Sequence, residues 1–429
     1  MVANTTLPNR AGIVYELSGT VEVGSDVGGD GAMAGGVGVT LTIEPGVVVY
    51  GRTLQDQLVI NRGSRINAVG TVSQPIIFTS RTNMLGGSYE HQKGGEWSGI
   101  TILGRAPVSG CPEAVPGGSA NCEQTVPGVG AKYGGGLAND NSGSLRYVQL
   151  RFAANEITSS PAALHLAGVG SATTIDHLQI ATSGVIGVHL MGGRVNLAHL
   201  IVASPYQGAL ATSFGYRGTI QFFLGITDLP GDFARMIVTG WNENESADSL
   251  PREYVRISNA SVLGSDAGQV NLTLEGRPDL VLLNSILSGE FCVRANGASL
   301  DAANPALEDL GPPIFRSVVA HCGWRPFWDN EAALTAIFAL DPNNDLQHIL
   351  SLSGGYLNGP NENAVPAIDP TGFNDDPYAV ADPAAPNRLI AVPYIGAVQN
   401  AADTWFQGWT CNYSFADFGG RSKCETPPR

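Results

Sequence analysis

A short apolar pattern that recurs along this 429-residue chain constrains its fold most strongly. The pattern is apolar, any residue, Tyr or His, apolar, any residue, apolar, and its first three copies begin 30 and then 22 residues apart. These copies are Leu145–Leu150, Ile175–Ile180 and Leu197–Val202, and a second, similar series is Ile257–Leu263, Leu283–Leu287 and Phe315–Val319. Direct repeats of strand-like segments without helices between them indicate a coil in which each turn pairs with the next.

We therefore expect an all-β protein, a right-handed parallel β-helix (β-solenoid). Like residues of successive coils lie one strand spacing apart in such a fold, so Tyr147, His177 and His199 should form a ladder of side chains. The alternatives, a β-sandwich or a propeller, would require antiparallel hairpins with two-residue turns at most junctions. The direct repetition of one pattern favours the coil.

The chain divides into a β-helix over residues 1–325 and a capping region over residues 326–429. Residues 109–142 are rich in Gly and Pro and predict a long loop insertion, and residues 226–253 predict an acidic excursion. Within the capping region, residues 331–340 follow Asp329-Asn330 and predict a short helix. A cap is expected because an open coil end exposes unpaired strand edges.

The six cysteines form three couples that are close in sequence, and this grouping favours three disulfides. The expected pairs are Cys111 with Cys122, Cys292 with Cys322, and Cys411 with Cys424. Disulfides persist in oxidising compartments, so an exported protein is expected. The alternative is six reduced thiols in the core of a cytosolic protein.

Charge and hydrophobicity exclude several classes of partner. The net charge is −15 at pH 7, which argues against nucleic-acid binding and gives no basic anchor for an anionic membrane. No apolar run reaches the length of a transmembrane segment. The first residues lack the pattern of a secretory signal, so we expect that a signal peptide has been removed from an extracellular or bacterial cell-surface protein.

Several segments of the chain resemble a widespread group of bacterial exported or lipid-anchored β-helix proteins. The resemblance implies fold and export, and it implies no catalytic residues. The chain departs from the group where relatives carry an Asp-rich segment, since residues 183–193 read SGVIGVHLMGG and residues 204–213 read SPYQGALATS. The matching segments are LTIEPGVVVYG (41–51), LVINRGSRINAVGTVSQPIIFTS (58–80), WSGITILGRAPV (97–108), NDNSGSLRYVQLRFA (139–153), LAGVGSATTIDHLQIATS (166–183), GGRVNLAHLIV (192–202), FGYRGTIQF (214–222) and YIGAV…DTWFQGWT (394–410).

Histidines provide the densest cluster of chemically versatile residues. His165, His177, His189 and His199 fall within residues 165–199, where stacked imidazoles are able to bind a metal or act as acid and base. His177 and His199 align with Tyr147, however, and a ladder that accepts Tyr favours a partly polar packing position. We therefore weigh a metal site against a structural polar ladder, and favour the ladder.

A calcium site is a weaker hypothesis, and otherwise we expect no cofactor. The Gly-rich residues 25–36 carry Asp26 and Asp30, whose carboxylates suit calcium, but the ligand spacing of known calcium loops is missing. The acidic excursion, with Glu243, Glu245 and Asp248, has the same status. A solvated loop is the favoured interpretation of both.

Catalysis is not indicated by the outward positions of the three best-defined coils, which carry one carboxylate, Asp176, among them. A paired-acid or multi-Asp site is thus not visible on that face, and we name no catalytic residue. Paired tryptophans in the tail, Trp324 with Trp328 and Trp405 with Trp409, suit sugar stacking, although we favour burial.

The first functional hypothesis is an extracellular or cell-surface structural or binding protein without catalytic activity, and one version of it is assembly into homo-oligomers, filaments or lattices. The alternative hypotheses are a carbohydrate-active enzyme, either a polysaccharide lyase or a hydrolase, and a glycan-binding partner of an outer-membrane uptake system.

Overall fold

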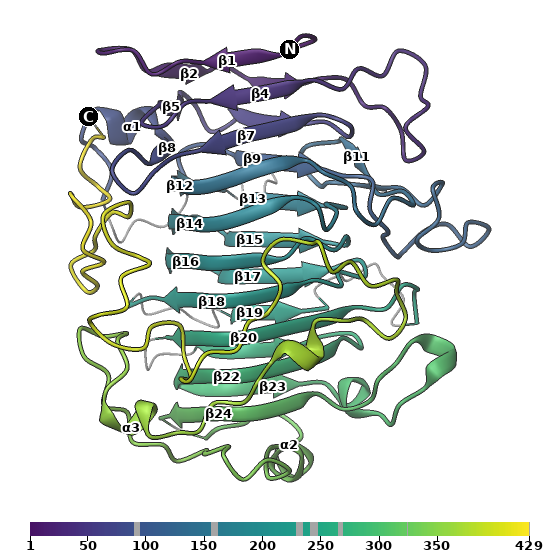
Figure 1. Ribbon diagram of the computed structural model, residues 1–429, viewed down its shortest axis with the longest axis vertical. Coiled ribbons are helices and arrows are strands. Elements are labelled where there is room, and N and C mark those ends of the chain that lie inside the picture. The colour runs from purple at the N-terminus through teal and green to yellow at the C-terminus, as the bar shows by residue number, and fades with distance from the viewer. Residues whose placement is uncertain are drawn as a thin grey trace.

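The computed structural model describes residues 1–89, 95–155, 162–228, 235–240, 248–264, 269–323 and 325–428. Two long parallel sheets, A and B, alternate along the chain and stack coil upon coil from the N-terminal end to β24, as Figure 1 shows. Every pairing within these sheets is parallel among the described residues. The structure is an all-β parallel β-helix, as the repeat predicts.

Sheet A changes its construction along the coil. In the first three coils it has two short strands per coil, whereas β12 pairs with both β7 and β8 and begins a run of longer strands. Sheet A contains β1 (Thr5–Leu7), β2 (Tyr15–Leu17), β4 (Thr40–Ile43), β5 (Val48–Gly51), β7 (Arg65–Val69), β8 (Ile76–Ser80), β12 (Gly143–Ala153), β14 (Thr174–Ser183), β16 (Leu197–Pro205), β18 (Thr219–Ile226), β20 (Tyr254–Leu263), β22 (Asp279–Gly289) and β24 (Ile314–Cys322).

Sheet B supplies one strand to each coil before that of β24 and lies opposite sheet A. It contains β3 (Thr20–Val23), β6 (Gln57–Ile60), β9 (Gly99–Leu103), β13 (Ala162–Ala167), β15 (Ile186–Met191), β17 (Gly208–Ser213), β19 (Arg235–Thr239), β21 (Val270–Leu274) and β23 (Phe291–Ala295).

Apolar side chains fill the space between the sheets in register. Val148 of β12 lies beside Leu178, then Leu200, Phe223 and Ala260 in successive coils, and all five are buried. Burial of one large apolar side chain contributes about 1.5–3 kcal/mol. The repeat in the sequence is therefore the pattern of this core.

A left-handed residue bends each long strand of sheet A at the same place. A positive φ is unfavourable for a residue with a Cβ, yet it recurs at the equivalent position of successive coils. Because the bends lie one above another, their side chains stack along the coil. The residues are Tyr147 (φ 51°), His177 (53°), His199 (52°), Phe222 (57°), Asn259 (52°), Asn284 (49°) and Ser317 (52°). The predicted ladder of Tyr147, His177 and His199 is the first part of this series.

The insertion at residues 109–142 packs on the outside of sheet B. It contains a small antiparallel hairpin, β10 (Gln124–Thr125) with β11 (Lys132–Tyr133), and the disulfide of Cys111 with Cys122. The other disulfides join Cys292 to Cys322 and Cys411 to Cys424, which are the pairs that the sequence spacing favours.

Helices and turns of 3₁₀ helix are few and short. α2 packs against β24 at the end of the coil, where we expected a capping helix, but Asn330 makes no side-chain cap and instead donates from Nδ2 to Ala295 O at 2.8 Å. The elements are α1 (Arg81–Met84), α2 (Glu331–Phe338), α3 (Pro360–Asn363), η1 (Gly297–Leu300), η2 (Pro305–Leu307) and η3 (Thr371–Phe373).

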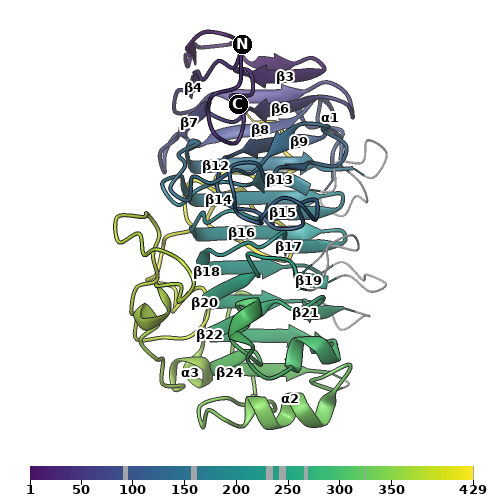
Figure 2. The ribbon, with the colours of Figure 1, turned by 90° about the vertical axis from the view of Figure 1, so that its right-hand side faces the viewer.

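The C-terminal tail, residues 345–428, does more than cover the last coil, which is the place we expected for it. It lies along the outer face of sheet A and returns to the N-terminal end of the coil, as the yellow trace in Figures 1 and 2 shows. Six polar side chains of sheet A donate hydrogen bonds to backbone carbonyls of the tail and so fasten it to that face. They are Gln149 to Trp409, Gln179 to Cys411, Gln221 to Ile390, Asn259 to Tyr394, Asn284 to Ile368 and Ser317 to Pro366.

Candidate functional sites

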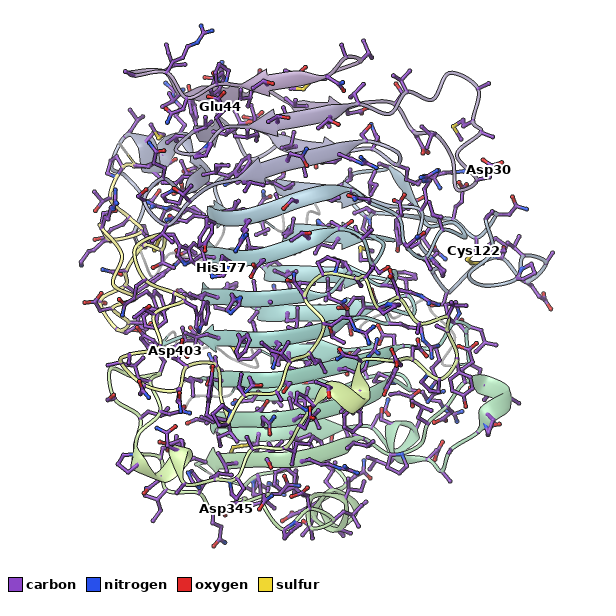
Figure 3. All side chains as sticks on the ribbon, in the orientation of Figure 1. Asp30, Glu44, Cys122, His177, Asp345 and Asp403 are labelled. Carbon is purple, nitrogen blue, oxygen red and sulfur yellow. A yellow bond between two sulfur atoms is a disulfide. The ribbon has the colours of Figure 1, made fainter. Side chains whose placement is uncertain are left out.

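Asp176, His177 and His199 form a compact cluster on adjacent strands of sheet A. The Asp176 Oδ1 atom lies 2.8 Å from His177 Nδ1 and 2.8 Å from His199 Nδ1, so both imidazoles share one carboxylate oxygen. The second oxygen, Oδ2, lies 3.4 Å from Arg146 Nε. Figure 3 labels His177 on the left-hand side of the strands, at about mid-height of the coil. We call this group the His–Asp cluster.

Aromatic rings hold the two imidazoles in place. The His177 ring lies 4.5 Å from the Tyr147 ring and 4.4 Å from the His199 ring, and His199 stacks on Phe222 at 4.8 Å. Trp405 of the tail approaches His199 at 5.1 Å. The order of these rings follows from the left-handed bend, which presents one side chain of each coil on the same line.

Burial and hydrogen bonding have opposite effects on the charges of this cluster. Burial alone would raise the pKa of Asp176, but the hydrogen bonds from His177 and His199 outweigh it and hold the pKa well below its usual value. Burial lowers the pKa of His177, and the neighbouring Asp176 offsets only part of that effect. At neutral pH the cluster therefore holds a charged carboxylate beside the neutral imidazole of His177.

The four histidines that the sequence grouped together form two separate pairs. His165 and His189 lie on β13 and β15 of sheet B, with ring centroids 5.9 Å apart. Both are buried, His189 Nε2 lies 2.8 Å from Ser213 Oγ, and burial lowers the pKa of His165 to about 4. The single cluster expected from their proximity in the sequence is not formed, because strands that follow one another in the chain belong to different sheets.

Asp26, in the loop considered for calcium, faces an arginine. Its carboxylate oxygens lie 2.7 Å from Arg62 Nε and 2.5 Å from Arg62 Nη2, and Arg62 also pairs with Glu123 at 2.6 Å. Burial tends to raise the pKa of Asp26, but the bonds to Arg62 prevail and lower it. Asp30 Oδ1 accepts from the backbone N–H of Ala32 at 2.9 Å. Calcium at this loop stays a prediction.

Part of the acidic excursion and one of the paired tryptophans of the tail lie outside the described residues. Glu243, Glu245 and Trp324 lie there, whereas Asp248 Oδ1 accepts from Arg277 Nη1 at 2.9 Å. Calcium at the excursion likewise stays a prediction.

A second candidate site, which the sequence analysis missed, is a cavity of about 310 Å³ between the coil and the tail. Four arginines line it: Arg194, Arg217 and Arg256 from the coil, and Arg388 from the tail. We call it the arginine pocket. Arg194 and Arg217 precede by three residues the register pair Leu197 and Ile220, but Arg256 does not share this offset, so the sequence pattern did not reveal the pocket.

The arginines of the pocket differ in their partners. Arg217 is buried and pairs with Asp376 at 2.6 Å and Glu308 at 2.5 Å, and Arg388 Nη2 donates to Asp375 at 2.9 Å. Within the described ranges, neither Arg194 nor Arg256 has a carboxylate at salt-bridge distance.

Arg256 and Arg194 differ in how far other hydrogen bonds replace the missing carboxylate. Arg256 donates to the carbonyls of Arg217, Phe373 and Asn374. Each of the two arginines has a buried Nε that meets no hydrogen-bond acceptor among the described residues, and no side-chain hydrogen bond of Arg194 is found there. Burial lowers the pKa of both guanidinium groups, and the nearby Asp376 offsets only part of that effect. An anion in the cavity would provide the missing acceptor.

The tail covers part of the outer face of sheet A over the central coils. Gln149 and Gln179, two of the outward residues inspected for catalysis, are buried and bind the backbone of the tail. Trp409 is buried against this face, which agrees with the interpretation of the tail tryptophans as packing residues.

Parallel strands that stack coil upon coil in two long sheets place the chain in the class of parallel β-helix proteins. A family profile described as "Pectate-lyase like beta helix domain" matches residues 15–298, more than half of the chain. The chain therefore belongs to the pectate-lyase-like β-helix domain family. No curated protein and no solved structure matches it.

None of the helices that the structure describes has the length and apolarity to span a bilayer.

Proposed function

We propose that the protein is a non-catalytic, extracellular β-helix that binds an acidic saccharide in the arginine pocket. The observation that carries the proposal is Arg194, which lines the cavity without a carboxylate partner among the described residues. A guanidinium matches the two oxygens of a carboxylate or sulfate, and such charge-assisted bonds are strong in a partly buried site.

Other groups in the pocket suit a sugar. Asn139 lines the same cavity and offers an amide for the hydroxyls of a saccharide, whereas Ser171 donates to Asp382 at 2.5 Å and Asn196 to Pro386 O at 3.0 Å. The family supports a saccharide rather than another anion, because the matched description names a pectate-lyase-like domain. Three disulfides support an oxidising, extracellular location.

The test is calorimetric binding of galacturonate oligomers, with neutral oligosaccharides of equal length as the comparison. Binding should be specific to the acidic oligomers, and Arg194→Gln should weaken it about tenfold or more, because a hydrogen bond to a charged group is lost. The control Arg52→Gln removes an exposed arginine with a 3.8 Å pair to Glu16 and should leave binding unchanged. Equal affinity of the wild type and Arg194→Gln would refute the proposal.

A carbohydrate-active enzyme is the second candidate, and the family match favours it. Incubation of the wild type with the same oligomers should then release unsaturated or reducing ends, which ultraviolet absorbance and a reducing-sugar assay detect. Intact oligomers at the end of the incubation contradict the enzyme and agree with a binding protein. Self-association and partnership with an uptake system stay predictions.

A further inference from the structure

The His–Asp cluster has the donor atoms of a transition-metal site. Two imidazole nitrogens and a carboxylate oxygen lie within 4.8 Å of one another, on side chains from two adjacent strands. Zinc prefers four ligands drawn from histidine nitrogen, cysteine sulfur and carboxylate oxygen, and an open zinc site has three protein ligands and one water. Two histidines and one aspartate match that set.

The distances leave room for an ion after a small adjustment. In a tetrahedral site with metal bonds of about 2.0 Å, ligand atoms lie about 3.3 Å apart. Each Nδ1 now lies 2.8 Å from Asp176 Oδ1, so the hydrogen bonds would open by roughly half an ångström as the ion replaced the shared protons.

The surroundings position the ligands before any ion arrives. The left-handed backbone at His177 and His199 and the rings of Tyr147 and Phe222 fix both imidazoles, so little side-chain entropy remains to be lost. Arg146 lies beside the second oxygen of Asp176 and orients the carboxylate from outside, as outer partners of metal ligands do.

One side of the cluster is open to solvent. The His199 side chain is 24% exposed and the Asp176 side chain 14%. A water molecule can therefore complete the coordination, and the ion has a route of entry.

We propose that Asp176, His177 and His199 bind one zinc ion, with water as the fourth ligand. The site lies apart from the arginine pocket, because none of its three residues lines that cavity. It therefore does not depend on the saccharide proposal.

The ladder itself supplies variants that should fold. His199→Phe places at this rung the residue found at the next one, Phe222, and His177→Tyr places there the residue found at the previous one, Tyr147. Both keep an aromatic ring in the stack and remove one ligand. Asp176→Asn keeps the shape of the third ligand and removes its charge.

The experiment is calorimetric titration of the chelator-treated full chain with zinc chloride, followed by cobalt substitution, whose visible spectrum reports tetrahedral coordination. We expect one zinc per chain, a cobalt spectrum of tetrahedral type, and more than about a hundredfold weaker binding in each of the three variants. The control His348→Asn alters a histidine that lies near Asp345 and should bind zinc like the wild type.

Circular dichroism and the melting temperature establish that each variant is folded. Absence of stoichiometric zinc binding by the wild type would overturn the proposal, and so would undiminished binding by folded His199→Phe. Arg194→Gln should bind zinc normally, so failure of the saccharide proposal leaves this one intact.

Discussion

Gln179 and Cys411 are 232 residues apart in the sequence and exchange two hydrogen bonds in the structure. Gln179 Nε2 donates to Cys411 O at 2.9 Å, and Cys411 N donates to Gln179 Oε1 at 2.8 Å. The side-chain amide of Gln179 thus donates to the tail and accepts from it, as the backbone of a neighbouring strand would. Because Gln149 and Gln221 make related contacts, the tail is an integral part of the fold.

Gln179→Met should release the tail locally. The change leaves the buried N–H and C=O of Cys411 without partners, and we expect a loss of about 2–4 kcal/mol in the free energy of unfolding. Urea unfolding measures that loss, and hydrogen exchange at the Cys411 amide should accelerate. The control Gln57→Met loses an exposed bond to Thr20 and should cost under about 0.5 kcal/mol. Equal losses in the two variants would contradict the role of Gln179.

The left-handed bend predicts opposite outcomes for two substitutions of Ser317. Ser317→Val introduces a β-branched side chain at φ 52° and removes the bond to Pro366 O, so a loss of about 2–3 kcal/mol is expected. Ser317→Asn should lose much less, because Asn259 and Asn284 occupy the same position in the two preceding coils. Thermal unfolding compares the two variants, and an equal loss would speak against the bend as the cause.

Burial of His165 predicts a loss of stability in mild acid. Its pKa is about 4 in the folded protein and near 6.5 when exposed, so the unfolded chain binds the additional proton between these values. The free energy of unfolding should therefore fall as pH decreases from 6.5 to 4, by up to about 1.4 kcal/mol per pH unit for this group.

His165→Thr tests this origin, because Thr101 is the register partner of His165 on the preceding strand of sheet B. The variant should show a shallower slope of unfolding free energy against pH in urea titrations. The exposed His321, changed to Thr, should leave the slope unaltered. An unchanged slope in His165→Thr would assign the acid sensitivity elsewhere.

Arg62 should be far more important for stability than its exposed neighbour Lys132. Arg62 is fully buried between Asp26 and Glu123, and Arg62→Met leaves Asp26 without its counter-charge and Glu123 with Lys132 alone, with an expected cost of about 3–5 kcal/mol. Lys132→Met breaks an exposed pair to Glu123 at 3.0 Å and should cost under about 1 kcal/mol. Denaturant unfolding measures both, and similar costs would show that Arg62 is not the principal partner.

Local periodicity was sufficient to predict the coil. Strand pairing between successive turns repeats one short pattern, so Tyr147, His177 and His199 revealed their shared position in the sequence itself. The cysteine couples are also local, since each pair is separated by 11, 30 or 13 residues.

The path of the tail and the arginine pocket were decided only by the tertiary structure. Both depend on contacts between residues far apart, such as Arg217 with Asp376, 159 positions away, and no periodic pattern marks such pairs. The same holds for the separation of the four histidines into two pairs, which required the assignment of each strand to a sheet. The repeating core could be derived from the order of the residues alone, because burial of like residues over like residues is a local rule. The irregular backbone of the tail is held by individual polar side chains, so its position became known only from the three-dimensional structure.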